Sequence, residues 1–82
     1  MSIIVKTLAR TKFNVPDVTE DMKIEDIKLV LMQKYNINMD QIRLIHAGKQ
    51  LESTKTVVES GIYNIENPVT ISMVLSLRGG YN

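Results

Sequence analysis

The sequence of 82 residues contains no cysteine and no tryptophan. Without cysteine the fold gains no disulfide, and the chain offers neither a thiol nucleophile nor a thiolate metal ligand. His46 is the single histidine, so it lacks a second imidazole with which to bind a metal, and a Ser-His-Asp arrangement has no further support. We therefore expect no metal site and no cofactor.

An excess of charge of one sign and long hydrophobic runs are also absent. Ten Lys and Arg residues against nine Asp and Glu residues leave a net charge of +1, whereas nucleic-acid-binding domains usually carry a concentrated basic stripe. No stretch of about 18 apolar residues and no signal-peptide pattern occurs. We therefore expect one small intracellular domain that binds neither nucleic acid nor membrane.

Two short segments rich in β-branched residues open the chain and predict a hairpin. Residues 2–8 read as a strand with Ile3 and Val5 on one face, and Lys12–Val15 alternates polar and apolar residues. The intervening residues 9–11 form the turn, although they lack the Gly or Asn that is typical there. Pro16 cannot donate a ladder hydrogen bond and should end the second strand.

A helix is predicted over Ile24–Tyr35, because Ile24, Ile27 and Leu31 recur at helical spacing. Asn36 follows the last periodic residue and tolerates the left-handed conformation of a helix C-terminal cap. The sequence therefore predicts one amphipathic helix whose apolar face packs on a sheet.

Further strands are predicted at Ile42–His46, residues 49–51 and residues 69–77, whereas residues 57–62 indicate one helical turn that Gly61 ends. One helix across one face of a mixed sheet buries these apolar faces most economically, which is an α+β fold. The predicted core consists of Ile3, Val5, Phe13, Val15, Ile24, Ile27, Leu31, Leu44, Leu51, Val57, Ile71 and Met73.

Several segments spread along the chain form a recognisable set. They are Met1, Ile3, Val5-Lys6-Thr7-Leu8, Arg43-Leu44-Ile45, Ala47-Gly48-Lys49-Gln50-Leu51-Glu52 and Leu77-Arg78-Gly79-Gly80. Together they closely resemble ubiquitin over nearly the whole chain, with a short insertion before the helix and a longer one before the last strand. The resemblance implies a ubiquitin-like β-grasp domain at residues 1–77 and a flexible C-terminal tail at residues 78–82.

The tail carries the function that the resemblance implies. A processing protease would cleave between Gly80 and Tyr81, and activating and conjugating enzymes with ligases would join Gly80 to lysines of target proteins. Gly79 and Gly80 have no Cβ to obstruct a narrow enzyme channel. The catalytic groups belong to those partners, so the chain itself would be a non-enzymatic modifier in the cytoplasm and nucleus, monomeric before conjugation.

Two apolar surfaces are predicted as partner sites. Leu44 and Ile45 have opposite strand parity, and the resemblance places Ile45 outside with Leu8, Val74 and Ser72. Exposed apolar clusters usually mark interaction sites, although scattered surface hydrophobic residues are common. By resemblance, a second cluster joins Ile37, Leu75 and Leu77.

Four lysines match lysine positions of ubiquitin and are possible acceptors for chain formation: Lys6, Lys28, Lys34 and Lys49. Lys49 matches the position best known for chains that direct proteins to degradation. Each of the four taken alone is better explained as an ordinary solvated surface charge. By resemblance, His46 stands where ubiquitin has a partly buried aromatic residue, so we expect it to pack.

Four alternatives differ in what the chain does. The neddylation (related-to-ubiquitin) modifier has a small residue at a position before its terminal glycines where ubiquitin has Arg. In this chain Ser76 stands at that position, and the resemblance implies that the activating enzyme recognises it together with Arg78. Residues 47–52 instead favour ubiquitin itself. We favour the neddylation type. A sulfur carrier of this fold generally ends at Gly-Gly and is less similar to ubiquitin, and a non-conjugated binding domain would not need Leu77-Arg78-Gly79-Gly80.

Overall fold

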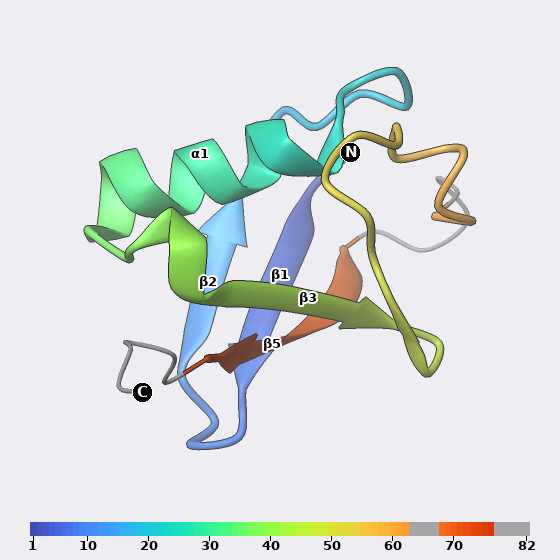
Figure 1. Cartoon of the computed structure of the whole chain (residues 1–82). Coiled ribbons are helices and arrows are strands. Elements are labelled where there is room, and N and C mark those ends of the chain that lie inside the picture. Colours follow the sequence, from blue (N-terminus) through green and yellow to red (C-terminus); the bar gives the residue numbers. More distant parts are fainter. Residues whose placement is uncertain (63–67, 77–82) are drawn as a thin grey trace.

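One helix lies across one face of a five-stranded sheet in the computed structural model, which describes residues 1–62 and 68–76 (Figure 1). The strand order is β2-β1-β5-β3-β4, with β1 and β5 parallel and the other neighbours antiparallel. This arrangement confirms the predicted α+β, ubiquitin-like β-grasp fold. The elements are β1 (Ile3–Thr7), β2 (Lys12–Val15), α1 (Ile24–Tyr35), the 3-10 helix η1 (Met39–Gln41), β3 (Ile42–His46), β4 (Lys49–Gln50) and β5 (Val69–Leu75).

The hairpin of β1 and β2 forms as the alternation predicts. Ile3 pairs with Val15 and Lys6 with Lys12, and β2 ends immediately before Pro16. Strand β1 is shorter than predicted because Leu8 belongs to the turn that follows it and not to the strand. That turn is closed by the Thr7 N–H, which donates to the Thr11 carbonyl oxygen at 2.9 Å.

Helix α1 has the predicted bounds because both of its ends are capped. The backbone N–H of Lys23, the residue before the helix, donates to the Asp26 carboxylate at 3.0 Å. This bond satisfies that N–H, and the negative charge of Asp26 in the first turn is favourable for the helix dipole. At the other end Asn36 adopts the left-handed conformation (φ 59°, ψ 43°), and its N–H donates to the Met32 carbonyl oxygen at 2.9 Å. The predicted role of Asn36 as C-terminal cap is thus confirmed.

The core lies between α1 and the inner face of the sheet. Eleven of the predicted core residues are buried, and Phe13 is the one that is only partly so. Its position on the edge strand β2 leaves part of the ring uncovered, while its other side meets the Tyr35 ring edge-on at 4.8 Å between centroids. Within residues 1–62 and 68–76, four further residues are buried that were not predicted: Val18, Ile42, Ile62 and Val69.

Residues 57–61 form turns, in keeping with the single helical turn predicted for residues 57–62. One helix-like hydrogen bond joins the Ser60 N–H to the Thr56 carbonyl oxygen at 3.0 Å, and Gly61 follows with a φ of +82°. Strand β5 ends at Leu75, earlier than predicted, and the Ser76 N–H donates to the Gln41 carbonyl oxygen at 2.7 Å. The end of β5 therefore lies beside η1.

Candidate protein-binding surface

The outer face of the sheet, opposite α1, carries the candidate surface. Directly paired residues form one row across all five strands: Lys12, Lys6, Ser72, Ile45 and Gln50. Because paired residues share a face and neighbours along a strand alternate, this row points away from the helix. The adjoining Leu44 and Met73 point inward and are buried, so the predicted parity of Leu44 and Ile45 is confirmed.

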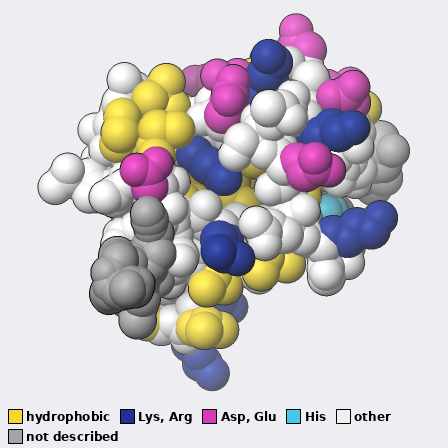
Figure 2. Space-filling view, in the orientation of Figure 1, with side chains coloured by type: hydrophobic (Ala, Val, Ile, Leu, Met, Phe, Trp, Pro, Cys, Tyr) yellow, Lys and Arg dark blue, Asp and Glu magenta, His cyan; other side chains and the backbone are white. Residues whose placement is uncertain are grey.

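Apolar side chains on this side of the molecule are grouped rather than scattered. Leu8 protrudes from the turn between β1 and β2 and is 91% exposed, while Ile45 and Val74 are half-buried and Ser72 is exposed. Hydrophobic side chains gather at the lower end of the molecule in Figure 2, where Figure 1 shows that turn. Such a cluster outside the core is typical of an interaction site.

Two hollows adjoin at Leu8. Both are lined by Thr7, Leu8, Met73 and Val74; one, of about 320 Å³, continues to Lys6, Arg10 and Ser72, and the other, of about 210 Å³, continues to Ala9 and Leu75. The first is partly basic and the second mostly apolar, so the surface around Leu8 combines apolar contact with positive charge.

The second predicted cluster is only partly described by the structure. Ile37 is half-buried and packs against the core, whereas Leu75 is 47% exposed although it shares strand parity with buried Met73. The hydrogen bond from Ser76 to η1 brings this end of β5 near the segment that follows α1. Leu77 lies outside the described residues.

Lys28 has the most distinctive surroundings of the four lysines. Its side chain is half-buried, and its Nζ donates to the Ser53 Oγ at 2.8 Å. Burial, with a smaller contribution from the positive charge of Arg43, lowers the pKa of Lys28 below its ordinary value. Lys6, Lys34 and Lys49 are exposed, and therefore more accessible than Lys28 to a partner enzyme.

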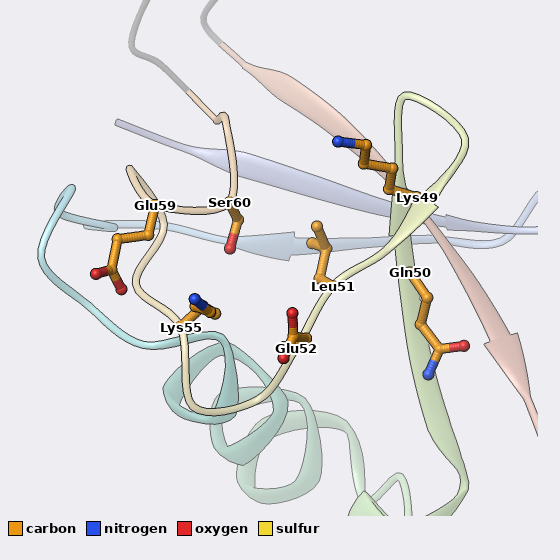
Figure 3. Close-up of a pocket in the computed structure, with 7 residues that line it drawn as sticks. All are labelled: Lys49, Gln50, Leu51, Glu52, Lys55, Glu59 and Ser60. Atoms are coloured by element: carbon orange, nitrogen blue, oxygen red, sulfur yellow. The ribbon is translucent and has the colours of Figure 1, made fainter.

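Lys49 lies at the rim of a polar hollow of about 200 Å³ (Figure 3). Its lining residues are Lys49, Gln50, Leu51, Glu52, Lys55, Glu59 and Ser60. Glu59 is already engaged, because its carboxylate accepts from the Thr56 N–H at 2.9 Å and its own N–H donates to the Thr56 hydroxyl at 3.1 Å. The bond from the Thr56 N–H is the main reason that the pKa of Glu59 is lowered.

Of the remaining site residues predicted from the sequence, the structure describes two and leaves the others outside the described residues. His46 is half-buried at the end of β3, and Ser76 follows β5 directly with intermediate exposure. Arg78, Gly79, Gly80 and Tyr81 lie outside the described residues. Within residues 1–62 and 68–76, no helix is long and apolar enough to cross a membrane, and no group of three metal-binding side chains occurs.

Two features near this surface were not anticipated from the sequence. Arg10, in the turn beside Leu8, has a φ of +67°. The predicted turn lacks a Gly or Asn, and this absence was the signal that another residue would adopt the left-handed conformation. The Tyr35 hydroxyl accepts from the Asn14 N–H at 3.1 Å and donates to the Asn14 carbonyl oxygen at 2.9 Å. It thereby covers part of the open edge of β2, a contact that no local pattern reveals.

Comparison with known proteins agrees with this geometry. The model of the Ubiquitin family matches residues 3–78. NEDD8, a ubiquitin-like protein of Dictyostelium discoideum, is 39% identical over 80 residues, which are 98% of this chain and 99% of that protein. Ubiquitin-like protein 1 of Schizosaccharomyces pombe is also 39% identical, over 98% of this chain and 97% of its own length.

A larger relative is matched only in part. The UV excision repair protein rhp23 of Schizosaccharomyces pombe is 33% identical over 76 residues, so that the chain spans only 20% of that protein's length. The family match nevertheless extends from β1 through the last described strand, with the fold and sheet face set out above. This chain belongs to the ubiquitin family.

Proposed function

We propose that the chain is a ubiquitin-like modifier, processed after Gly80 and conjugated through that glycine to lysines of target proteins. The observation that carries the proposal is the end-to-end match to NEDD8, which extends over nearly the whole of both chains. That match covers 98% of this chain and 99% of the relative, and the chain carries Gly79-Gly80, the pair that conjugation would use. Its proposed partners are activating and conjugating enzymes, ligases, a processing protease and the targets, in the cytoplasm and nucleus.

Within this function we propose the neddylation type. Ser76, which follows β5, is short and neutral. An activating enzyme whose acidic groups pair with an arginine at this position would leave those groups desolvated and unpaired against serine, at a cost of about 1–3 kcal/mol. An enzyme that accepts a small residue meets no such cost. A divergent ubiquitin remains the alternative within the same class.

A second candidate is a ubiquitin-like domain that binds partners without being conjugated. The observation that favours it is the match to rhp23, in which the related segment is a fifth of a larger protein. Such a domain would use the face around Leu8, Ile45 and Val74 but would have no need of a free Gly80. The two candidate functions therefore differ in whether they require a free Gly80 at the C-terminus.

Thioester formation tests both choices. A protein ending at Gly80 is incubated with ATP and either the ubiquitin-activating or the neddylation-activating enzyme, and the reducible adduct is quantified. We expect efficient charging by the neddylation enzyme, and a gain with the ubiquitin enzyme after Ser76→Arg. Ser60→Arg, in the segment before β5, is the matched control for an added positive charge and should change neither rate.

Each other outcome has a defined meaning. Efficient charging of the unmutated protein by the ubiquitin enzyme alone makes the chain a divergent ubiquitin. Failure with both enzymes, while the Ile45 face still binds ubiquitin-type receptor domains, favours the non-conjugated domain.

A further inference from the structure

Lys28 is a half-buried cation whose hydrogen-bond partner carries no charge. It lies in the second turn of α1, and its Nζ donates to the Ser53 Oγ at 2.8 Å. Within residues 1–62 and 68–76, the group bonded to this ammonium is that hydroxyl and not a carboxylate. An ionised acceptor makes a stronger hydrogen bond to an ammonium than a neutral one does. The pair therefore leaves a positive charge that an anion carried by Ser53 would neutralise.

Two further features make the surroundings of Ser53 positive. Arg43, on β3, is exposed, and its charge adds to the lowering of the pKa of Lys28 by burial. The Ser53 carbonyl oxygen accepts from the Glu25 N–H at 3.0 Å, so Ser53 also lies beside the first turn of α1. The dipole of a helix favours negative charge at that end.

Ser53 lies in a turn at the surface of the molecule. Its side chain is half-buried, and the neighbouring Glu52 and Thr54 are exposed. Figure 3 shows the stretch between Glu52 and Lys55 passing beside α1. Glu52 opposes a second negative charge here, but because its side chain is exposed, water and salt screen this repulsion. The hydroxyl is thus within reach of a modifying enzyme and next to cations that would stabilise an added anion.

We propose that Ser53 is a phosphorylation site and that Lys28 holds the phosphate, with Arg43 attracting it at longer range. A serine kinase transfers the γ-phosphoryl group of ATP to the Ser53 Oγ. The new O–P bond forms as the bond to the ADP oxygen breaks, and the serine proton passes to a base of the kinase and then to solvent. The phosphate adds nearly two negative charges and three acceptor oxygens.

The phosphate changes both the fold and the reactivity of Lys28. The neutral hydrogen bond becomes an ion pair that ties α1 to the turn after β4, so the modification stabilises the protein. The adjacent anion also raises the pKa of Lys28, and a protonated amine is not a nucleophile. Under the proposed function, phosphorylation of Ser53 would withdraw Lys28 from use as an acceptor. The site itself does not depend on conjugation of Gly80.

The proposal is tested on the full, unconjugated chain with phosphoserine incorporated at position 53, so its failure leaves the thioester result unaffected. Thr54→phosphoserine is the reference, because Thr54 is the exposed neighbour. Titration by phosphorus NMR should give the phosphate on Ser53 a second pKa below its ordinary value of about 6 and below that of the reference. The midpoint of thermal unfolding should rise by about 3–6 °C over that of the unmodified chain. Labelling of Lys28 by an amine-reactive ester should slow at least about threefold.

Variants show whether Lys28 is the group that holds the phosphate. Lys28→Gln removes the cation, and the rise in the unfolding midpoint on phosphorylation should then be lost. Lys34→Gln is the matched control, because Lys34 is an exposed lysine of the same helix, and it should keep the rise. Each variant is compared with and without the phosphate, so any effect of the substitution itself cancels.

Phosphopeptide mapping tests whether the cell makes this modification. Trypsin cuts after Lys49 and Lys55, and fragmentation of the peptide 50–55 separates Ser53 from Thr54. With phosphatases inhibited, we expect phosphate on Ser53. The proposal is overturned if this peptide is found only unmodified or carries phosphate on Thr54 alone. It is equally overturned if phosphate on Ser53 lowers the unfolding midpoint, or if Lys28→Gln retains the full rise.

Discussion

At the scale of single residues, Ile45 occupies the centre of the outer sheet face, paired with Ser72 on one side and Gln50 on the other. Ile45→Ala should leave the fold nearly intact, because the side chain is half-buried and its strand neighbour Leu44 provides the core contact. Binding to ubiquitin-type receptor domains should weaken by on the order of 2 kcal/mol, as for a central apolar anchor. Titration calorimetry measures this loss.

Leu29→Ala is the matched control for Ile45→Ala. Leu29 is an aliphatic side chain that is 37% exposed, whereas Ile45 is half-buried, and Leu29 lies on α1, which covers the opposite face of the sheet. Its truncation should leave receptor affinity unchanged. A collapse of thermal stability in Ile45→Ala would instead show that Ile45 belongs to the core and that the outer face is not a binding surface.

Lys28 provides a second residue-scale prediction. Its Nζ donates to the Ser53 hydroxyl at 2.8 Å, and the positive charge of Arg43 adds to the lowering of its pKa by burial. Ser53→Asp should place a carboxylate beside this cation and raise the free energy of unfolding by roughly 0.5–1 kcal/mol, a value suited to a partly exposed pair. Ser53→Asn, which has the same shape without the charge, is the control and should give no such gain.

The pH dependence of the Ser53→Asp gain has a defined sign. The ammonium lowers the folded-state pKa of the new aspartate, so the added stability is present above the unfolded pKa of about 4 and is lost as the pH falls further. Urea unfolding at several pH values measures it. A gain that persists unchanged well below that pH would show that the aspartate acts without its charge.

At the scale of elements, α1 holds the sheet's inner face together. Leu31 is fully buried beside Ile24 and Ile27, the residues that carry the helical period. Leu31→Ala should lower the free energy of unfolding by about 2–5 kcal/mol, through lost apolar burial and the cavity left behind. An unchanged urea midpoint would show that the inward face of the helix is wrongly assigned.

Elements with a strong local pattern were predictable, and those set by distant contacts were not. The helix bounds followed from the apolar spacing and from Asn36, whose left-handed cap is a local property. Burial of Val18 and Ile62 was missed because both lie outside helices and strands, where periodicity gives no information. Leu8 was placed in a strand because a sequence alone does not reveal where the ladder gives way to the turn.

For the candidate surface, too, the local features were predictable from the sequence and the distant contacts were not. Strand parity separates Leu44 from Ile45, and the structure then adds their partners across the sheet. The contact of Lys28 with Ser53 joins residues 25 positions apart, and no spacing rule connects a helix to a loop over that distance. The positive φ of Arg10 was indicated only by what the turn lacks.

At the scale of the whole molecule, one face of the sheet packs on α1, and the other is the face that we propose to bind partners; the family match covers all the strands that form both faces. Under the proposed function, this division would let partners recognise the surface while the C-terminus is engaged in a bond. The proposed function therefore depends on whether Gly80 is joined to other proteins in the cell.

Mass spectrometry of proteins from the source cell tests this claim most directly. Digestion with a protease that cleaves only after lysine cuts behind Lys55, the last lysine of the chain, and leaves residues 56–80 attached to any conjugated lysine. This branched remnant is specific to the chain, unlike the Gly-Gly stub that cleavage after Arg78 would produce. We expect target lysines that carry residues 56–80, with Tyr81 and Asn82 absent. A chain that persists with Tyr81-Asn82 in place, with no lysine bearing the remnant, would contradict the account.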